Sequence, residues 1–279
     1  MGGLFVLAAW AIGVVAFWPS VEWARPIAFV LAAGAMHGSL GLLDDVNSVV
    51  RRRSLGLTAP RKLLLGSLAA IVLFFAFRDV LAVPQRIPFS MATLTLSPIA
   101  TFALVWISLL ATTNSLNLAD GLDGLAGGLA IVISIGLLAL SPSSATLVLV
   151  VPLLGALGGF LWMNVHPARI FLGDIGAFGV GGVIAAVSLC TGTILYLPLV
   201  AGVLVLEATS VILQIVTYRA LGVRLFKMSP LHHHFEESTR ARTPHVLPAF
   251  EWPETKITAR FWLLQVAFVI VALWAGDVV

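Results

Sequence analysis

Long apolar runs separated by short polar segments dominate the chain. About nine of these runs approach the roughly 20 residues that an α-helix needs to cross a bilayer. We therefore predict an all-α fold, a polytopic transmembrane helical bundle of about nine spans, forming a single integral-membrane domain over residues 1–279. The predicted spans cover residues 3–18, 24–43, 62–80, 98–116, 122–140, 145–163, 175–191, 197–217 and 259–276.

Composition agrees with a membrane protein and excludes other classes. Hydrophobic residues make up 59% of the chain and charged residues only 10%, whereas a soluble domain has about 25% charged residues. The single cysteine, Cys190, lies in an apolar run, which excludes a disulfide framework and a thiolate metal cluster. The net charge of +3 gives no indication of nucleic-acid binding. The longest polar segment, about 218–258, is expected to form a structured loop with a short interfacial helix.

The basic residues predict an orientation. If the N-terminus is cytoplasmic, all of the 16 Lys and Arg residues except Arg25, Arg78 and Arg86 fall on the inner side. Cytoplasmic loops are enriched in Lys and Arg, so this orientation is favoured. With nine spans, it places the C-terminus outside.

Acidic residues recur at the ends of the apolar runs that this orientation places on the cytoplasmic side. Asp44 and Asp45 end the second run, and adjacent carboxylates at a helix end point in different directions and rarely share one task. Asn117, Asp120 and Asp123 follow the fourth run at intervals of three residues. This spacing predicts three polar groups on nearly one side of a helical turn, with glycines between them that let a ligand approach the backbone.

Two further segments carry candidate chemistry on the same side. Asp174 opens the seventh run, where a helix N-terminus favours anions. An N-cap role is the simpler interpretation, and it is compatible with metal binding. His232, His233 and His234 are consecutive, so they cannot easily bind one zinc ion together, and no cysteine assists them. We expect them to donate hydrogen bonds to phosphate oxygens or to carry a proton.

Glu207 lies inside the eighth run. An acid within a membrane span is a functional hypothesis, but a structural hydrogen bond to a neighbouring helix explains it equally well, and we leave it out of the catalytic set. No P-loop or dinucleotide-binding glycine motif is present. A transporter would place its acids near the midplane, whereas these lie at one boundary. Carboxylates at a bilayer boundary with a bound Mg²⁺ fit phosphoryl transfer.

Seven segments carry a family resemblance: LLDD at 42–45, GLTAPRK at 56–62, NSLNLADGLDGLAGG at 114–128, NVHPARIFLGDIGAFGVGG at 164–182, LEATSVILQ at 206–214, RLFKMSPLHHHFE at 224–236 and WPETKITARFW at 252–262. Together they resemble the polyprenyl-phosphate N-acetylhexosamine-1-phosphate transferase superfamily. The SPLHHHFE part of the sixth segment favours its phospho-N-acetylmuramoyl-pentapeptide transferase branch over the GlcNAc-1-phosphate branch.

The resemblance implies a reaction and its partners. Phospho-MurNAc-pentapeptide would pass from UDP-MurNAc-pentapeptide to undecaprenyl phosphate, giving lipid I and UMP for peptidoglycan synthesis, with Mg²⁺ as cofactor. The resemblance also implies a homodimer surrounded by membrane lipid in the bacterial cytoplasmic (inner) membrane, with its active site on the cytoplasmic face. No nucleic acid is expected among its partners.

The resemblance also implies residue roles. Asp44 would activate the lipid phosphate with Asp45 beside it, and His233 completes the catalytic set with Asp174. Asp174 would bind Mg²⁺, with Asn117 and Asp120 in the same metal region. The implied substrate-binding residues are Lys62, Asn117, Asp120, Asp123, Asn164, Phe171, His232 and His234. We favour direct attack by the lipid phosphate over a covalent phospho-enzyme, because that phosphate is already a good nucleophile.

The chain departs from the family pattern at three places. The family has an earlier transmembrane helix and a loop ending in Thr-Met-Gly-Gly, whereas this chain opens at Met1-Gly2-Gly3, as though inside that motif. Ser48 stands where the family often has Lys, and the segment 237–251 is longer than usual. A truncated, inactive homologue is therefore an alternative, as is a related GlcNAc-1-phosphate transferase.

Overall fold

The computed structural model describes residues 2–18, 24–51, 56–237 and 244–277. Helices account for most of this part of the chain, as the apolar runs predict. Four of the basic residues used for the orientation, Arg52, Arg53, Arg240 and Arg242, lie outside the described residues, as does part of the 237–251 segment. The helices are α1 (Gly2–Phe17), α2 (Ala24–Arg51), α3 (Ala59–Ala76), α4 (Pro98–Ala119), α5 (Leu125–Leu140), α6 (Ser144–Asn164), α7 (Gly173–Cys190), η2 (Ile194–Tyr196), α8 (Leu197–Val200), α9 (Gly202–Leu221), α10 (Leu231–Phe235) and α11 (Glu254–Asp277).

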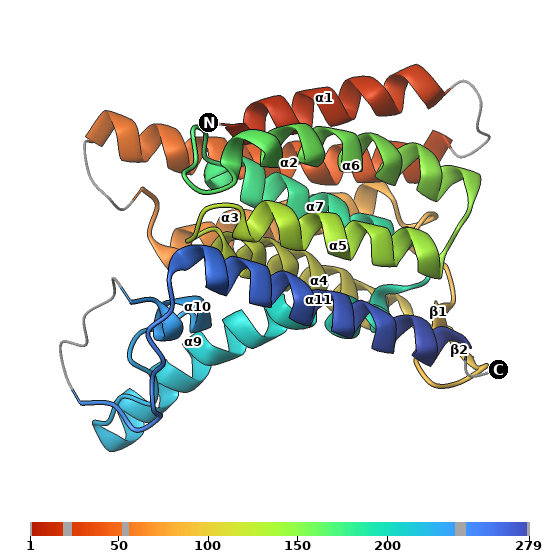
Figure 1. Cartoon of the computed structure of the whole chain (residues 1–279). Helices are drawn as coiled ribbons and strands as arrows, with labels where there is room; N and C mark the ends of the chain where they lie inside the picture. The colour runs from red at the N-terminus through yellow and green to blue at the C-terminus, as the bar shows by residue number, and fades with distance from the viewer. Residues whose placement is uncertain (1, 19–23, 52–55, 238–243, 278–279) are drawn as a thin grey trace.

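The all-α membrane class is confirmed, with a small addition. Within the described part of the chain, seven helices are long and apolar enough to cross a membrane, and α1 and α5 are shorter apolar helices of 16 residues each. Two strands of two residues, β1 (Gln85–Arg86) and β2 (Thr93–Leu94), pair antiparallel, with Gln85 opposite Leu94. They join α3 to α4 at the end of the bundle where the C-terminus lies (Figure 1).

Helix α7 forms the centre of the bundle. Every residue from Ile175 to Cys190 is buried, because α1, α2, α4 and α5 surround it. Small residues let α2 approach α7 closely: a Cβ on Gly41 would collide with the Asp174 carbonyl oxygen. This close crossing brings Asp44 and Asp45, one turn beyond Gly41, to the N-terminus of α7.

The predicted eighth span, 197–217, is wrong as a single helix. The chain forms α8, breaks at Ala201 and restarts as α9, which continues to Leu221. The break exposes backbone groups that a buried site must satisfy, and Gln265 of α11 satisfies them. Its side chain is fully buried, accepts a hydrogen bond from the Val203 N–H at 3.1 Å and donates one to the Val200 carbonyl.

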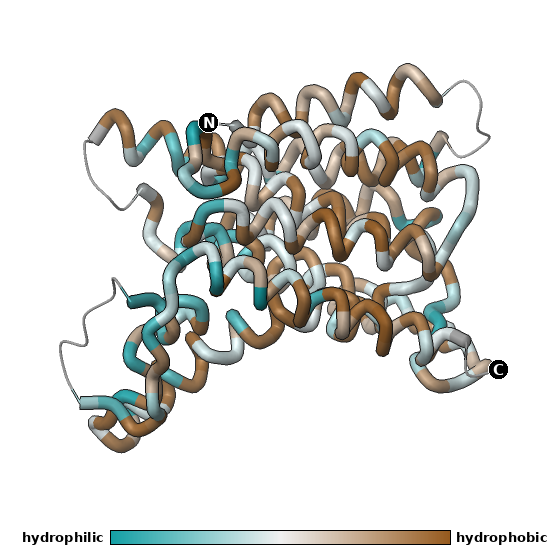
Figure 2. The backbone as a smooth tube through the Cα atoms, viewed as in Figure 1, coloured by the Kyte–Doolittle hydropathy of each residue, from teal (hydrophilic) through white to brown (hydrophobic). Residues whose placement is uncertain are grey.

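The polar residues gather at one end of the bundle. Figure 2 shows hydrophilic segments where α2, α4 and α6 end and where α3, α5, α7 and α11 begin, with α10 and the loop after α9 beside them. The opposite end carries β1, β2 and the C-terminus. The predicted site segments therefore share one end of the molecule.

Candidate functional site

Lys62 lies between two of the predicted carboxylates. Its Nζ is 2.7 Å from Asp44 Oδ2 and 2.6 Å from Asp174 Oδ2. Asp44 ends a turn of α2 and is 5% exposed, and the backbone N–H of Leu57 donates a hydrogen bond to its other oxygen. The GLTAPRK segment thus supplies both a backbone donor and an ammonium group to the same carboxylate.

Asp45 has a different task from Asp44, as expected for adjacent carboxylates. Its carboxylate accepts hydrogen bonds from the Asp174 and Ile175 N–H groups, at 3.2 and 3.3 Å. The N-cap residue of α7, Leu172, has no side-chain oxygen to offer, so Asp45 supplies the cap from another helix. Gly173 adopts φ +71°, and a Cβ there would lie 3.0 Å from Asp45 Oδ2.

Asp174 lies at the N-terminus of α7, as predicted, but it is not the N-cap residue, which is Leu172. Asp174 lies in the first turn of α7, and its side chain points to Lys62 and to Asn117, whose Nδ2 donates to Asp174 Oδ1 at 2.7 Å. Helices α2, α3, α4 and α7 therefore converge on this one carboxylate. We define the acidic centre as Asp44, Asp45, Lys62, Asn117, Asp120 and Asp174.

Asp120 belongs to the acidic centre because its carboxyl group interacts electrostatically with the charges of Asp174 and Asp45. It follows the end of α4, and burial, with the neighbouring Asp174 charge, raises the pKa of Asp120 to about 7. Asp45 raises this pKa further, while a hydrogen bond from the Gly173 backbone opposes the shift. Carboxylates that repel each other in this way would be relieved by a cation.

Asp123 does not share a helical turn with Asn117 and Asp120, contrary to the spacing argument. Helix α4 ends at Ala119, and residues 120–124 turn before α5 begins. The Asp123 carboxylate accepts a hydrogen bond from the Ala168 N–H at 2.9 Å and lies 3.1 Å from His166 Nδ1. The turn therefore sends Asp123 to a second group of side chains.

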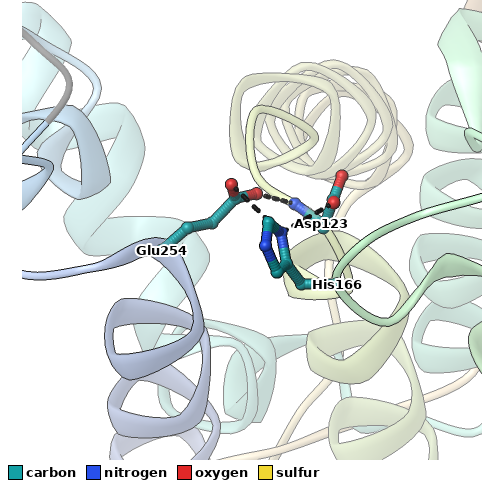
Figure 3. A group of neighbouring side chains, drawn as sticks. All are labelled: Asp123, His166 and Glu254. Carbon is teal, nitrogen blue, oxygen red and sulfur yellow. Dashed lines mark hydrogen bonds and ion pairs between the residues drawn. The ribbon is translucent and has the colours of Figure 1, made fainter.

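Figure 3 shows this second group, formed by Asp123, His166 and Glu254. Glu254 opens α11, accepts a hydrogen bond from the Asp123 N–H and lies 3.5 Å from His166 Nδ1. Ligand atoms of all three lie within 4.8 Å of one another. His166 and Glu254 were not predicted as site residues, although both occur in the motifs at 164–182 and 252–262. Mg²⁺ prefers oxygen ligands, so this mixed group suits it less well than the acidic centre.

Asn164 and Phe171 flank the loop before α7. Asn164 is 4% exposed, and its amide accepts from the Gly124 N–H at 3.1 Å and donates to the Ile170 carbonyl at 2.8 Å. It therefore ties this loop to the start of α5. Phe171 is 62% exposed, so its ring is free to stack against a flat ligand.

The three consecutive histidines have three different partners. His232 Nδ1 lies 3.1 Å from Glu207, His233 Nδ1 lies 2.6 Å from Glu236, and His234 Nδ1 accepts from the Lys227 N–H. Burial lowers the pKa of His233 and of His234, and for His233 the neighbouring His232 adds to the effect. The imidazoles do not converge on one ion.

The acidic centre fits a hard divalent cation. Asp120 and Asp174 offer carboxylate oxygens, and Asn117 offers an amide oxygen if its side chain is turned by 180°. The chemistry of this group of oxygens supports the fit: Asp174 lies beside Asn117 and Lys62, and the Asp174 charge contributes to the raised pKa of the neighbouring Asp120.

Comparison with known proteins gives a consistent result. Residues 27–192 match the family described as Glycosyl transferase family 4. The chain is 36% identical to the phospho-N-acetylmuramoyl-pentapeptide-transferase of Caldanaerobacter subterraneus subsp. tengcongensis, with 99% of this chain and 83% of that protein covered. It is 36% identical to the protein of the same name from Rubrobacter xylanophilus (96% and 80% covered) and 39% identical to that from Symbiobacterium thermophilum (94% and 77% covered).

Proposed function

Because the chain belongs to glycosyl transferase family 4, we propose that it transfers phospho-MurNAc-pentapeptide from UDP-MurNAc-pentapeptide to undecaprenyl phosphate. The products are lipid I and UMP, and the setting is the bacterial inner membrane. The observation that carries the proposal is the acidic centre, in which four helices bring carboxylates and Lys62 to the polar end of an apolar bundle.

The acceptor has both an apolar and an anionic part, and the structure offers a surface for each. A cavity lined almost entirely by apolar side chains lies between α4, α8 and α9, with Leu104, Ile107, Pro198 and Leu204 among its lining residues. Its lining extends along α4 to Ser115, two residues before Asn117. An isoprenoid chain in this cavity would present its phosphate to the acidic centre.

In the proposed reaction an oxygen of the lipid phosphate attacks the sugar-linked phosphorus of the donor. A new P–O bond forms, the bond to the bridging oxygen breaks, and UMP leaves with that oxygen. Asp44 orients the acceptor phosphate and takes up its proton if it arrives protonated, while Lys62 offsets phosphate charge. A bound Mg²⁺, held by Asp174, Asp120 and Asn117, would neutralise charge on the diphosphate.

The remaining site residues serve the donor. Asp123 and Phe171 lie at the same end of the bundle. The Asp123 carboxylate is a hydrogen-bond acceptor and the Phe171 ring is exposed, so both suit a nucleobase. Asn164 bonds the backbone of Gly124 and of Ile170, and so ties together the two loops that carry Asp123 and Phe171. His232, His233 and His234 follow α9 beside the loop of residues 120–124. Their neutral or charged rings can donate hydrogen bonds to phosphate and sugar oxygens.

The test is an assay of purified protein in detergent with UDP-MurNAc-pentapeptide, undecaprenyl phosphate and Mg²⁺, following UMP release. Asp174→Asn should lower turnover about 100-fold or more, the scale of losing one electrostatic group from an active site. The fold should persist, because Asn can still occupy the same space. Full activity in this variant would remove the assigned role, and UMP release only with UDP-GlcNAc would favour the GlcNAc-1-phosphate alternative.

A further inference from the structure

Glu207 and His232 form a fully buried pair outside the acidic centre. Both side chains are 0% exposed, and His232 Nδ1 lies 3.1 Å from Glu207 Oε1. The His232 backbone N–H also donates to the other carboxylate oxygen at 3.4 Å. Glu207 lies in α9 and His232 in α10, so this pair fixes the orientation of the histidine segment relative to a membrane-spanning helix.

The other ring nitrogen of His232, Nε2, points toward the turn of residues 120–124. Nε2 is buried and has no hydrogen-bond partner among the described residues. It faces Gly121, where an added Cβ would collide with it. Gly121 lies between Asp120 and Asp123, in the turn that sends one carboxylate to the acidic centre and the other to His166 and Glu254.

A buried ring nitrogen without a partner is costly, although His37 Nε2 in α2 is also buried without a partner among the described residues. His232 differs from His37 in position, because its Nε2 faces the turn between Asp120 and Asp123. The carboxylate of Glu207 is a hydrogen-bond acceptor and lies against Nδ1, so it favours the tautomer in which Nδ1 carries the proton and donates the hydrogen bond. Nε2 of the neutral ring then has a free lone pair. This lone pair can accept a hydrogen bond from a hydroxyl or amide N–H of a ligand when the turn of residues 120–124 moves away from Nε2.

We propose that Glu207 is a positioning residue that holds His232 with its proton on Nδ1 and its Nε2 directed at the turn that carries Asp120 and Asp123, as an acceptor for a hydroxyl or amide group of the sugar-nucleotide donor. The assignment of the ligand rests on the proposed function. Glu207 lies within one turn of Leu204 and Val205, which line the apolar cavity. The pair therefore connects α9, which lies beside the apolar cavity, to the turn of residues 120–124.

The first experiment needs no substrate. In protein labelled with ¹⁵N-histidine, the His232 resonances are assigned by their loss in His232→Gln, and their shifts report which nitrogen is protonated. We expect the proton on Nδ1 in the unaltered protein and in Glu207→Gln, whose amide oxygen still accepts it. Glu207→Leu should give a mixture of tautomers. A proton on Nε2 in the unaltered protein would overturn the proposal, with no variant needed.

The second experiment uses the transferase assay. Glu207→Leu should lower kcat/KM for the UDP donor by about 10–100-fold, the usual effect of removing a group that orients a ligand-binding histidine. Glu207→Gln should recover most of this loss. In a His232→Ala background, Glu207→Leu should cost less than twofold, because residues that act as a unit are not additive. Ser210→Ala is the matched control: Ser210 is buried one turn further along α9, bonds the Glu207 backbone carbonyl and should tolerate the change.

Multiplicative effects of the two substitutions would contradict the positioning role. So would an unchanged His232 spectrum in Glu207→Leu. If the unaltered protein shows no transfer from any UDP-sugar, the proposed function fails, while the tautomer measurement still decides whether Glu207 positions His232.

Discussion

Lys62 supplies the positive charge between Asp44 and Asp174 in the acidic centre. Its ammonium group is 2.7 Å from Asp44 and 2.6 Å from Asp174, with 18% of its side chain exposed. Lys62→Met leaves these two carboxylates without that cation. We expect a loss of about 2 kcal/mol in the free energy of unfolding, below the roughly 3–5 kcal/mol of a fully buried ion pair that loses one partner.

Mg²⁺ provides the sharper measurement for this variant. Thermal unfolding in detergent should show a larger stabilisation by Mg²⁺ in Lys62→Met than in the unaltered protein. In the variant the Lys62 ammonium group no longer offsets the charges of Asp44 and Asp174, so a bound Mg²⁺ relieves more repulsion between them. Arg61→Met, an exposed neighbour in the same turn, is the control and should respond to Mg²⁺ like the unaltered protein. Equal Mg²⁺ shifts in all three proteins would place the ion elsewhere.

The titration of Asp120 gives a prediction of definite sign. Burial and the Asp174 charge raise the pKa of Asp120 from 3.8 to about 7. Between these values the folded protein holds a proton that the unfolded chain has released, so this group makes the metal-free protein less stable as pH rises from about 4 to 7. Above pH 7 the contribution is constant.

Asp120→Asn removes this titration. In a chelating buffer, the thermal midpoint of the variant relative to the unaltered protein should rise between pH 5 and pH 7.5. Added Mg²⁺ should erase that advantage at pH 7.5, because the ion stabilises the charged carboxylate. A difference in midpoint that does not vary with pH would show that Asp120 keeps an ordinary pKa.

At the scale of elements, the side chain of Gln265 pairs two of the backbone groups at the break between α8 and α9. Gln265→Leu would keep the volume but leave the Val203 N–H and Val200 carbonyl unpaired inside the bundle. Two buried unsatisfied groups cost about 2–6 kcal/mol together, at about 1–3 kcal/mol each. A clear drop in the thermal midpoint should follow, whereas Leu263→Ala, at a position 70% exposed, should change it little. An unchanged midpoint would mean that the break tolerates unpaired groups.

Apolar run length predicted the helices well but could not predict this break. Hydropathy records whether a segment can lie in lipid, and residues 197–217 can. Whether the segment continues as one helix depends on Gly202 lying against Phe268 and on Gln265 reaching from α11, more than sixty residues away. Local pattern carries no information about such a partner.

The same limit applies to the site. The motifs singled out candidate carboxylates, because acids at the ends of apolar helices are costly, and Asp44, Asp45 and Asp174 do lie together. The grouping of Asn117, Asp120 and Asp123 was not predictable: the three-residue spacing indicated a shared turn for them, but α4 ends at Ala119. Partners such as His166, Glu254 and Glu207 come from distant segments, so only the folded chain brings them together.

At the scale of the whole molecule, the candidate site lies at one end of the bundle and the hairpin of β1 and β2 at the other (Figure 1). The first end carries the acidic centre, the group of Asp123, His166 and Glu254, and the histidine segment. The lysine and arginine distribution predicts that the first end faces the cytoplasm. Substituted cysteines test this directly. The native Cys190 is buried, so a Cys190→Ser background removes little structure and leaves no competing thiol.

Arg169→Cys and Met91→Cys place thiols at exposed positions on the two ends of the bundle. In intact bacterial cells whose outer membrane has been made permeable, a membrane-impermeant maleimide should label the cysteine at 91 and not the one at 169. After lysis of the inner membrane both should react. Labelling of the cysteine at 169 and not at 91 before lysis would mean that the protein has the opposite orientation, with the acidic centre outside the inner membrane. A cytoplasmic UDP-linked donor could not reach it there, so the same experiment tests the proposed function through the orientation on which it depends.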